Sequence, residues 1–186
     1  MKYYCTVDFK EVSSEWAIRE KVPLQQLLHN RDPLIKRLPK DTVWFKVNVD
    51  KNDFASFRVI GSDIGWQIVS DFNCEIPSVA RNTETPPKIN SSLAHQLLPD
   101  GRTIQKYVSD LVEGLRKFRE SAGDKNHNLT LILIAPIKEG PFTILEGNHA
   151  AVGLYFRHFV DHPELPYPPH TSYVGISPSM EQCLWY

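Results

Sequence analysis

The feature that most constrains the fold is the segment 129–135, in which Thr130 is the one polar residue. Its leucines and isoleucines, packed into so short a length, predict a buried strand of high β-propensity. Lys138-Glu139-Gly140 then supplies turn residues, and residues 142–145 form a second apolar run. The two runs and the turn between them predict a β-hairpin.

The residues directly after this hairpin predict a strand that turns into a helix. Gly147 interrupts the second strand, and Asn148 is a favourable N-cap for a helix expected to extend to about Phe159. A helix start presents free backbone N–H groups and the positive end of the helix dipole. Here they lie beside a carboxylate, Glu146, and an imidazole, His149, which can both transfer protons. We therefore predict the functional site at this corner.

Each of these residues also has a simpler interpretation. Glu146 suits a general acid or base or a metal ligand, but a carboxylate near a helix start also stabilises the helix. His149 is expected to be neutral, because the helix dipole disfavours imidazolium, and could donate to a phosphate or relay a proton. The alternative is an ordinary packed or solvated histidine. Gly147 and Asn148 are expected to act mainly through their backbone.

The rest of the chain mixes helices and strands. The strongest helix prediction covers Thr103 to about Glu120, where apolar residues recur at helical spacing. Strands are expected at 43–49, 57–60, 66–69 and 171–176. Shorter helices are expected at 15–20, capped by Ser13 or Ser14, and on either side of Asp32-Pro33. Without a regular β-α-β alternation, this order predicts an α+β fold: a compact single domain with a mixed sheet.

Composition narrows the classes of protein. A length of 186 residues fits one domain, and a net charge of −1 lacks the basic excess typical of nucleic-acid partners. No apolar run is long enough for a membrane span, and the first residues lack a signal core, so a cytoplasmic protein is expected. Nothing in the sequence indicates an oligomeric state.

The cysteines and histidines predict no metal site. The three cysteines, Cys5, Cys74 and Cys183, are far apart, which argues against a disulfide framework and a zinc ribbon. His158 and His162 have the i, i+4 spacing of a zinc pair. Favourable charge at the C-terminal end of a helix explains this pair more simply.

Residues 142–155, Phe-Thr-Ile-Leu-Glu-Gly-Asn-His-Ala-Ala-Val-Gly-Leu-Tyr, resemble the central motif of the ParB/sulfiredoxin-like superfamily. In that motif a hairpin leads into an Asp- or Glu-Gly-x-His-Arg type of turn and then a helix. The resemblance covers about residues 100–177, including the helix at 103–120 and the strand at 171–176. It implies a ParB/sulfiredoxin-like core in the C-terminal half, while residues 1–100 have no recognised match.

The resemblance also implies a site. The superfamily includes partition proteins that bind nucleoside triphosphates, sulfiredoxins that use ATP and a free-serine kinase, which share a phosphate held at the helix start. By position, Glu146 matches the motif acid, Gly147 the glycine, Asn148 the variable residue and His149 the histidine.

Ala150 stands where the motif usually has an arginine, so a strong bidentate phosphate contact is missing. Arg102, Arg157 and Lys88 are the candidates to replace it. The sulfiredoxin cysteine has no counterpart beside His149, so sulfiredoxin chemistry is not expected. The implied cofactor is ATP with Mg.

Three functions follow as hypotheses. The first is a small-molecule enzyme that binds an anionic or phosphorylated ligand at the 146–150 turn, with ATP-dependent phosphotransfer as its most concrete form. The second is a non-catalytic module that senses a ligand or binds a protein with the same pocket. The missing arginine and the four tryptophans suit this hypothesis as well. The third, a DNA-binding partition-like protein, is least favoured by the net charge.

Overall fold

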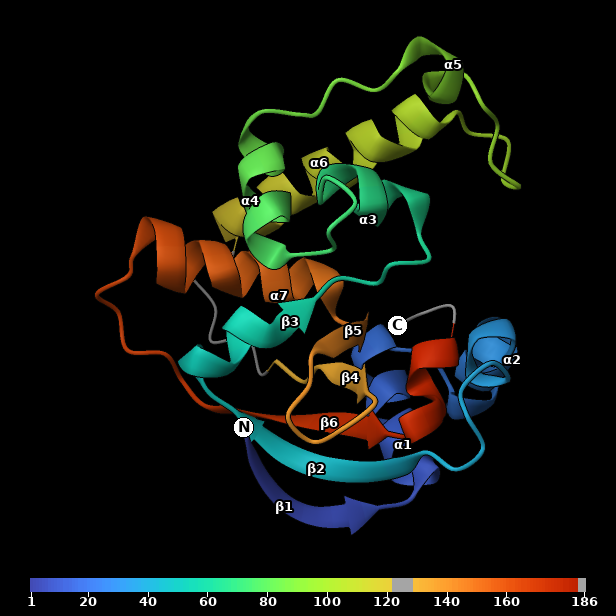
Figure 1. Cartoon of the computed structure of the whole chain (residues 1–186), viewed down its shortest axis with the longest axis vertical. Coiled ribbons are helices and arrows are strands. Elements are labelled where there is room, and N and C mark those ends of the chain that lie inside the picture. Colours follow the sequence, from blue (N-terminus) through green and yellow to red (C-terminus); the bar gives the residue numbers. More distant parts are fainter. Residues whose placement is uncertain (122–128, 184–186) are drawn as a thin grey trace.

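The computed structural model describes residues 1–121 and 129–183. Within them, six strands form one sheet in the order β1-β2-β6-β4-β5-β3 (Figure 1). The strands are β1 (Lys2–Val7), β2 (Val43–Val49), β3 (Phe57–Arg58), β4 (Ile132–Ala135), β5 (Phe142–Glu146) and β6 (His170–Ile176). The β4–β6 and β3–β5 pairs are parallel, and the other pairs are antiparallel. The mixed sheet therefore combines strands from both halves of the chain.

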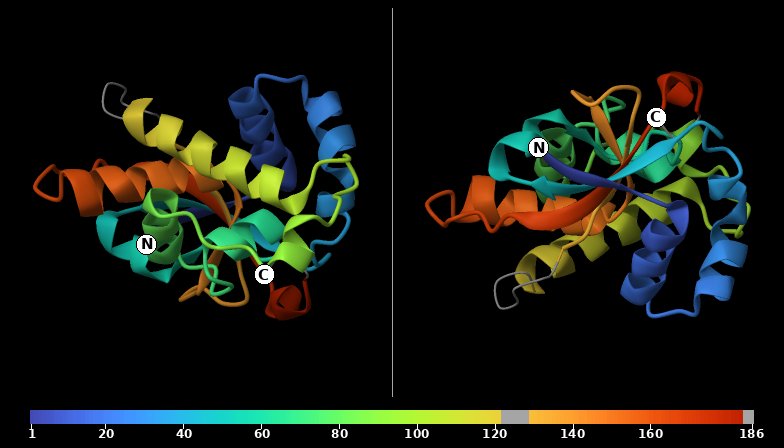
Figure 2. Two further views of the ribbon diagram at one scale, coloured as in Figure 1. Left: turned by 90° about the horizontal axis from the view of Figure 1, so that it is seen from above. Right: turned by 90° about the horizontal axis from the view of Figure 1, so that it is seen from below.

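Helices form two groups around this sheet. They are α1 (Phe9–Glu20), α2 (Leu24–Ile35), α3 (Ile64–Val69), α4 (Ile76–Glu84), α5 (Ser91–Ala94), α6 (Ile104–Ser121) and α7 (Asn148–Tyr155), with 3-10 segments η1 (Lys51–Ser56) and η3 (Pro178–Gln182). A π-helical segment, η2 (Phe156–Asp161), continues α7. The helices α3, α4, α6 and α7 pack against one another, whereas α1 packs on α2 (Figures 1 and 2). Glu15 of α1 and Leu154 of α7 line one cavity beside β6, so these two helices cover the same face of the sheet.

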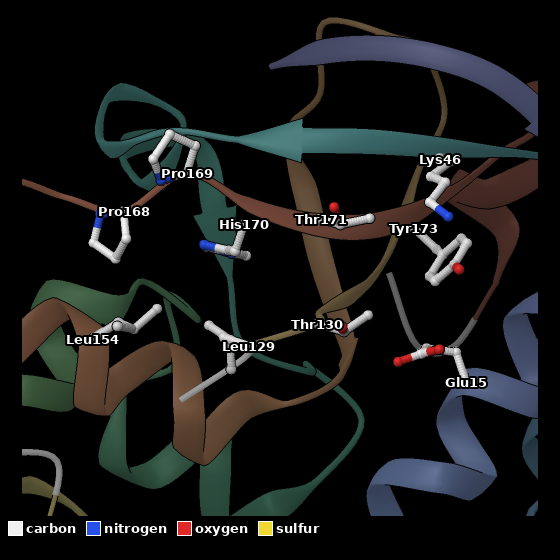
Figure 3. Close-up of a pocket in the computed structure, with 10 residues that line it drawn as sticks. All are labelled: Glu15, Lys46, Leu129, Thr130, Leu154, Pro168, Pro169, His170, Thr171 and Tyr173. Atoms are coloured by element: carbon white, nitrogen blue, oxygen red, sulfur yellow. The ribbon is translucent and has the colours of Figure 1, made fainter. Parts of the chain in front are cut away.

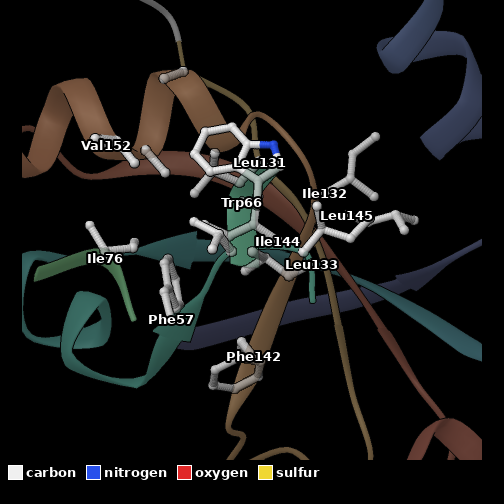
Figure 4. Packing of buried hydrophobic residues seen from close by; sticks show 14 of the residues in the cluster. Phe57, Trp66, Ile76, Leu131, Ile132, Leu133, Phe142, Ile144, Leu145 and Val152 are labelled. Atoms are coloured by element: carbon white, nitrogen blue, oxygen red, sulfur yellow. The ribbon is translucent and has the colours of Figure 1, made fainter. Parts of the chain in front are cut away.

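The hydrophobic core surrounds β4 and β5. All four residues of β4 are buried, which accounts for an apolar run without polar interruption. Figure 4 shows side chains from β4 and β5, among them Leu133 and Ile144, together with Trp66 of α3 and Val152 of α7. The corner between β5 and α7 is therefore held by core side chains of the sheet and of the helices.

The structure confirms the α+β class and a compact single domain with a mixed sheet. The predicted hairpin is present as β4 and β5, and the predicted helix at 103–120 is α6. The strands predicted at 43–49 and 171–176 are β2 and β6. These segments have the longest or clearest apolar patterns in the chain.

The strand predicted at 66–69 is wrong, because these residues belong to helix α3. The Oδ1 atom of Asp63 accepts hydrogen bonds from the backbone N–H groups of Gly65 (2.8 Å) and Trp66 (3.2 Å). This N-cap starts a helix whose apolar side chains are buried, and a short buried helix has no distinctive periodicity.

The N-terminal helices also differ from the prediction. The first begins at Phe9 rather than at residue 15, because Asp8 is its cap and accepts a hydrogen bond from the Glu11 N–H (2.8 Å). The second is one continuous helix through Asp32-Pro33. Pro33 lies in its last turn, where a missing backbone donor removes a single helical hydrogen bond.

None of the helices in residues 1–121 and 129–183 combines the length and the apolar character that a membrane span requires.

Candidate functional site

The corner between β5 and α7 is built around Gly147. Its φ of +98° lies in the left-handed region, which glycine adopts without a steric penalty. Gly147 is therefore the N-cap, and the prediction of Asn148 at that position is wrong by one residue. The amide of Asn148 instead accepts a hydrogen bond from the Ile60 N–H and donates one to the Ile144 carbonyl, both at 3.2 Å. Asn148 thus joins the helix start to β5 and to the loop before α3.

A pocket of about 450 Å³ opens at this corner. Four of the predicted site residues, Glu146, Gly147, Asn148 and His149, line it together with Leu145. The remaining lining residues are Asn30, Arg31, Pro33 and Leu34 of α2, and Ile60, Asp63 and Trp66 at the start of α3. The pocket therefore joins three segments that are far apart in the sequence.

Glu146 lines this pocket, as does Asp63, and 24% of the Glu146 side chain is exposed. Burial raises the pKa of Glu146 above its usual value, although Arg19 and Arg31 oppose the shift. The Nη2 atom of Arg31 lies 3.8 Å from Oε2 of Glu146. A carboxylate whose pKa is raised toward neutrality is better suited to give and take protons than an ordinary surface glutamate.

His149 lies at the mouth of the pocket with part of its ring exposed. The ring meets Trp66 edge-on, with the ring centroids 5.1 Å apart. The protein around it lowers the pKa of His149, and the nearby carboxylate of Asp63 only partly offsets this burial effect. The imidazole is therefore neutral at neutral pH and can donate or accept a hydrogen bond.

Both carboxylate oxygens of Asp63 accept hydrogen bonds from the protein. Its Oδ1 caps α3, and its Oδ2 accepts a hydrogen bond of 2.6 Å from the hydroxyl of Tyr107 on α6. Burial, assisted by this hydrogen bond, raises the pKa of Tyr107 above its usual value. Asp63 thus anchors Trp66 and α3 beside the corner.

Two arginines that the sequence did not point to lie at the corner. The Arg19 guanidinium packs on Gly147, with Nη1 3.1 Å from the position that a Cβ would occupy. That Nη1 is buried and has no hydrogen-bond partner within the part of the chain that the structure describes. Arg31 lines the pocket itself. Both arginines come from helices in the half without a recognised match, and no local motif connects them to residue 146.

The arginines and lysine named from sequence lie elsewhere. Arg102 pairs with Asp100 (2.6 Å) and approaches Asp110 (3.8 Å) on the surface. Arg157 lies in η2, beyond the far end of α7, and Lys88 lines a groove against α6. Ala150 is 8% exposed and packs in the core. Among the described residues, none of these four lines the pocket at the corner.

A second cavity of about 550 Å³ lies beside β6, between α1 and α7. Figure 3 shows Glu15 and Lys46 at one end of this cavity, Thr130 and Thr171 in the middle and His170 toward the other end. None of the site residues named from sequence lines it in the described part of the chain.

The two histidines considered as a zinc pair, His158 and His162, lie in different environments. His158 is 3% exposed, whereas His162 lies on the surface with its Nδ1 atom 3.4 Å from Oε1 of Glu164. Within residues 1–121 and 129–183, no three histidine, cysteine or acidic side chains are placed to hold a metal ion together.

Comparison of the chain with models of protein families, with curated proteins and with solved structures finds no match. The ParB/sulfiredoxin-like resemblance therefore stays a prediction from residues 142–155. What the structure adds is the pocket, with its carboxylate, imidazole and guanidinium.

Proposed function

We propose that the protein is a small-molecule enzyme that binds an anionic or phosphorylated ligand in the pocket at residues 146–149. The observation that carries this proposal is the convergence of Glu146, His149 and Arg31 on one pocket. Groups with perturbed pKa values that share a cleft with a cation are typical of catalytic sites.

Each group has a role in this proposal. Glu146 is the general acid or base, because burial raises its pKa toward neutrality. His149, which is neutral, orients the ligand or relays a proton. Arg31 and the backbone N–H groups at the start of α7 bind the anionic group.

ATP with Mg is the most concrete ligand of this kind. Glu146 is the pocket carboxylate that could contribute an oxygen ligand to Mg²⁺, which in turn would offset the charge of the phosphates. Phosphotransfer would then need the acceptor hydroxyl of the second substrate within reach of Glu146.

A non-catalytic sensor is the second candidate. It is favoured by one observation: Arg31 is already paired with Glu20 at 2.7 Å, so the pocket has no preformed phosphate clamp. A sensor would return its ligand unchanged, whereas an enzyme would convert it. A partition-like DNA-binding function would instead require binding that weakens steeply as salt is raised.

A thermal-shift screen with nucleotides and phosphorylated metabolites, with and without Mg²⁺, followed by product analysis, tests the proposal. We expect a ligand that stabilises the wild type and is converted, with conversion strongly reduced in Glu146→Gln. Glu113→Gln, at an exposed ion pair on α6, is the matched control and should behave like the wild type. Conversion that is unchanged in Glu146→Gln would refute the role of Glu146, and a bound but unconverted ligand would support the sensor.

A further inference from the structure

Arg31 lies between two carboxylates at the edge of the pocket. Its Nη2 atom is 2.7 Å from Oε1 of Glu20 and 3.8 Å from Oε2 of Glu146. The side chain of Arg31 is 40% exposed, compared with 23% for Glu20 and 24% for Glu146. Arg31 is therefore the most accessible member of this group.

Glu20 is held in place from the other side. Its Oε1 also accepts a hydrogen bond of 2.7 Å from the indole N–H of Trp16, which is fully buried. Because Trp16 fixes Glu20 and Arg31 has a long exposed side chain, Arg31 is the partner that can move. An incoming anion can replace Glu20 as the acceptor without disturbing the core.

Arg19 cannot take this role. Its guanidinium lies against Gly147, and its Nη1 is out of contact with solvent. Its positive charge offsets the negative charge of Glu146, although Arg19 does not line the pocket. Arg31 is consequently the guanidinium that a ligand in the pocket can reach.

The charges at the pocket disfavour a ligand with several anionic groups. Two arginines, Arg19 and Arg31, lie at the corner together with three carboxylates, on Glu20, Asp63 and Glu146. With two cations against three anions, the site has no excess positive charge to attract several phosphates.

One wall of the pocket is apolar. Five side chains form this wall: Pro33, Leu34, Ile60, Trp66 and Leu145. Such a wall suits the carbon skeleton of a ligand, because burial of apolar surface stabilises the complex.

We propose that the ligand carries a single anionic group on an apolar or aromatic body, and that Arg31 receives the anion in competition with Glu20. The proposal rests on the proposed function and narrows the class of its ligand: one anionic group on an apolar body takes the place of ATP. Glu20 holds Arg31 when the pocket is empty, and the apolar wall formed by Pro33, Leu34, Ile60, Trp66 and Leu145 holds the ligand body.

Phenyl phosphate is the probe, and inorganic phosphate and phenol represent its two halves. Titration calorimetry on the full chain should show phenyl phosphate binding more tightly than either half. Arg31→Ala should weaken its binding by about tenfold and Arg31→Lys by less, because lysine keeps the charge but loses the planar fork.

Glu20→Gln tests whether Glu20 competes with the ligand for Arg31. If the Glu20–Arg31 pair had a purely structural role, this variant would not bind the ligand more tightly. Glutamine can still accept the Trp16 hydrogen bond, but it holds Arg31 less strongly. We expect phenyl phosphate to bind about threefold more tightly to this variant, which is the size expected for a partly exposed ion pair. Binding of phenol should not change.

Asp161→Asn is the matched control. It neutralises the acidic partner of Arg119, whose Nε lies 2.8 Å from Asp161, away from the pocket. Its affinity for phenyl phosphate should equal that of the wild type.

Three results would overturn the inference. They are equal binding of inorganic phosphate and phenyl phosphate, no loss of affinity in Arg31→Ala, and no gain in Glu20→Gln. If one of these results is obtained but Glu146→Gln still abolishes conversion of a ligand found in the metabolite screen, the ligand class is wrong and the proposed function stands. If that screen finds neither binding nor conversion, the proposed function fails as well.

Discussion

Asn148→Ala would remove the side chain that holds the β5–α7 corner to the rest of the molecule. The amide makes two buried hydrogen bonds, one from the Ile60 N–H and one to the Ile144 carbonyl. Alanine leaves both backbone groups without their partner, and each unsatisfied buried group costs about 1–3 kcal/mol. The expected loss of unfolding free energy is therefore about 2–6 kcal/mol.

Chemical denaturation of the wild type and the variant measures this loss directly. For a chain of this length the same change lowers Tm by about 4–24 °C. Asn90→Ala is the matched control, because Asn90 makes one exposed capping hydrogen bond of 2.9 Å to the Ser92 N–H. That substitution should lower the free energy of unfolding by about 1 kcal/mol or less.

Equal losses in the two variants would refute this account of the corner. It would mean that the Asn148 amide does not fix the Ile60 loop against β5. A loss confined to Asn148→Ala would instead show that the pocket wall formed by Ile60 depends on this one side chain. Ligand binding measured on the same variant should then weaken in parallel.

Three further predictions concern stability, and denaturation measures each of them. Gly147→Ala should lower the free energy of unfolding by about 2 kcal/mol or more, because a Cβ there would be strained and crowded. In Gly101→Ala the new Cβ meets no atom within 4 Å, so this variant should show the cost of the backbone strain alone. Gly153→Ala should destabilise the protein, since its Cβ would overlap the ring of Phe118 on α6, whereas Gly114→Ala, with ordinary contacts, should stabilise it by about 0.5–1 kcal/mol. Burial lowers the pKa of His170 from 6.5 to about 4, so the folded protein binds fewer protons than the unfolded chain between these values. Stability should therefore fall by up to about 3 kcal/mol as pH drops from 6.5 to 4, and the fall should be smaller in His170→Gln.

The β5–α7 corner could be predicted from sequence because its determinants are local. A buried apolar run, a turn and a glycine before a helix all lie within residues 129–150. The position of the cap was wrong by one residue, since either Gly147 or Asn148 could occupy it. Only the backbone conformation decides between them.

The arginines at the pocket could not be predicted, because their placement depends on tertiary packing. Arg19 and Arg31 reach Glu146 only after α1 and α2 have packed beside the sheet. The sequence instead suggested Arg102, Arg157 and Lys88, and the structure places Arg102 in a surface ion pair with Asp100. The strand predicted at 66–69 is wrong for a related reason: the capping carboxylate of Asp63 decides the local structure, and a four-residue apolar run does not.

The order of strands in the sheet has a consequence for biosynthesis. β6 lies between β2 and β4, although it is the last of the described strands to be made. Until residues 170–176 leave the ribosome, β2 and β4 each have an unpaired edge, and open edges pair readily with other chains. We expect nascent chains to depend on chaperones until β6 emerges. Fragments that contain the 146–149 corner but lack β6 should aggregate, because the strand that joins the two parts of the sheet is missing.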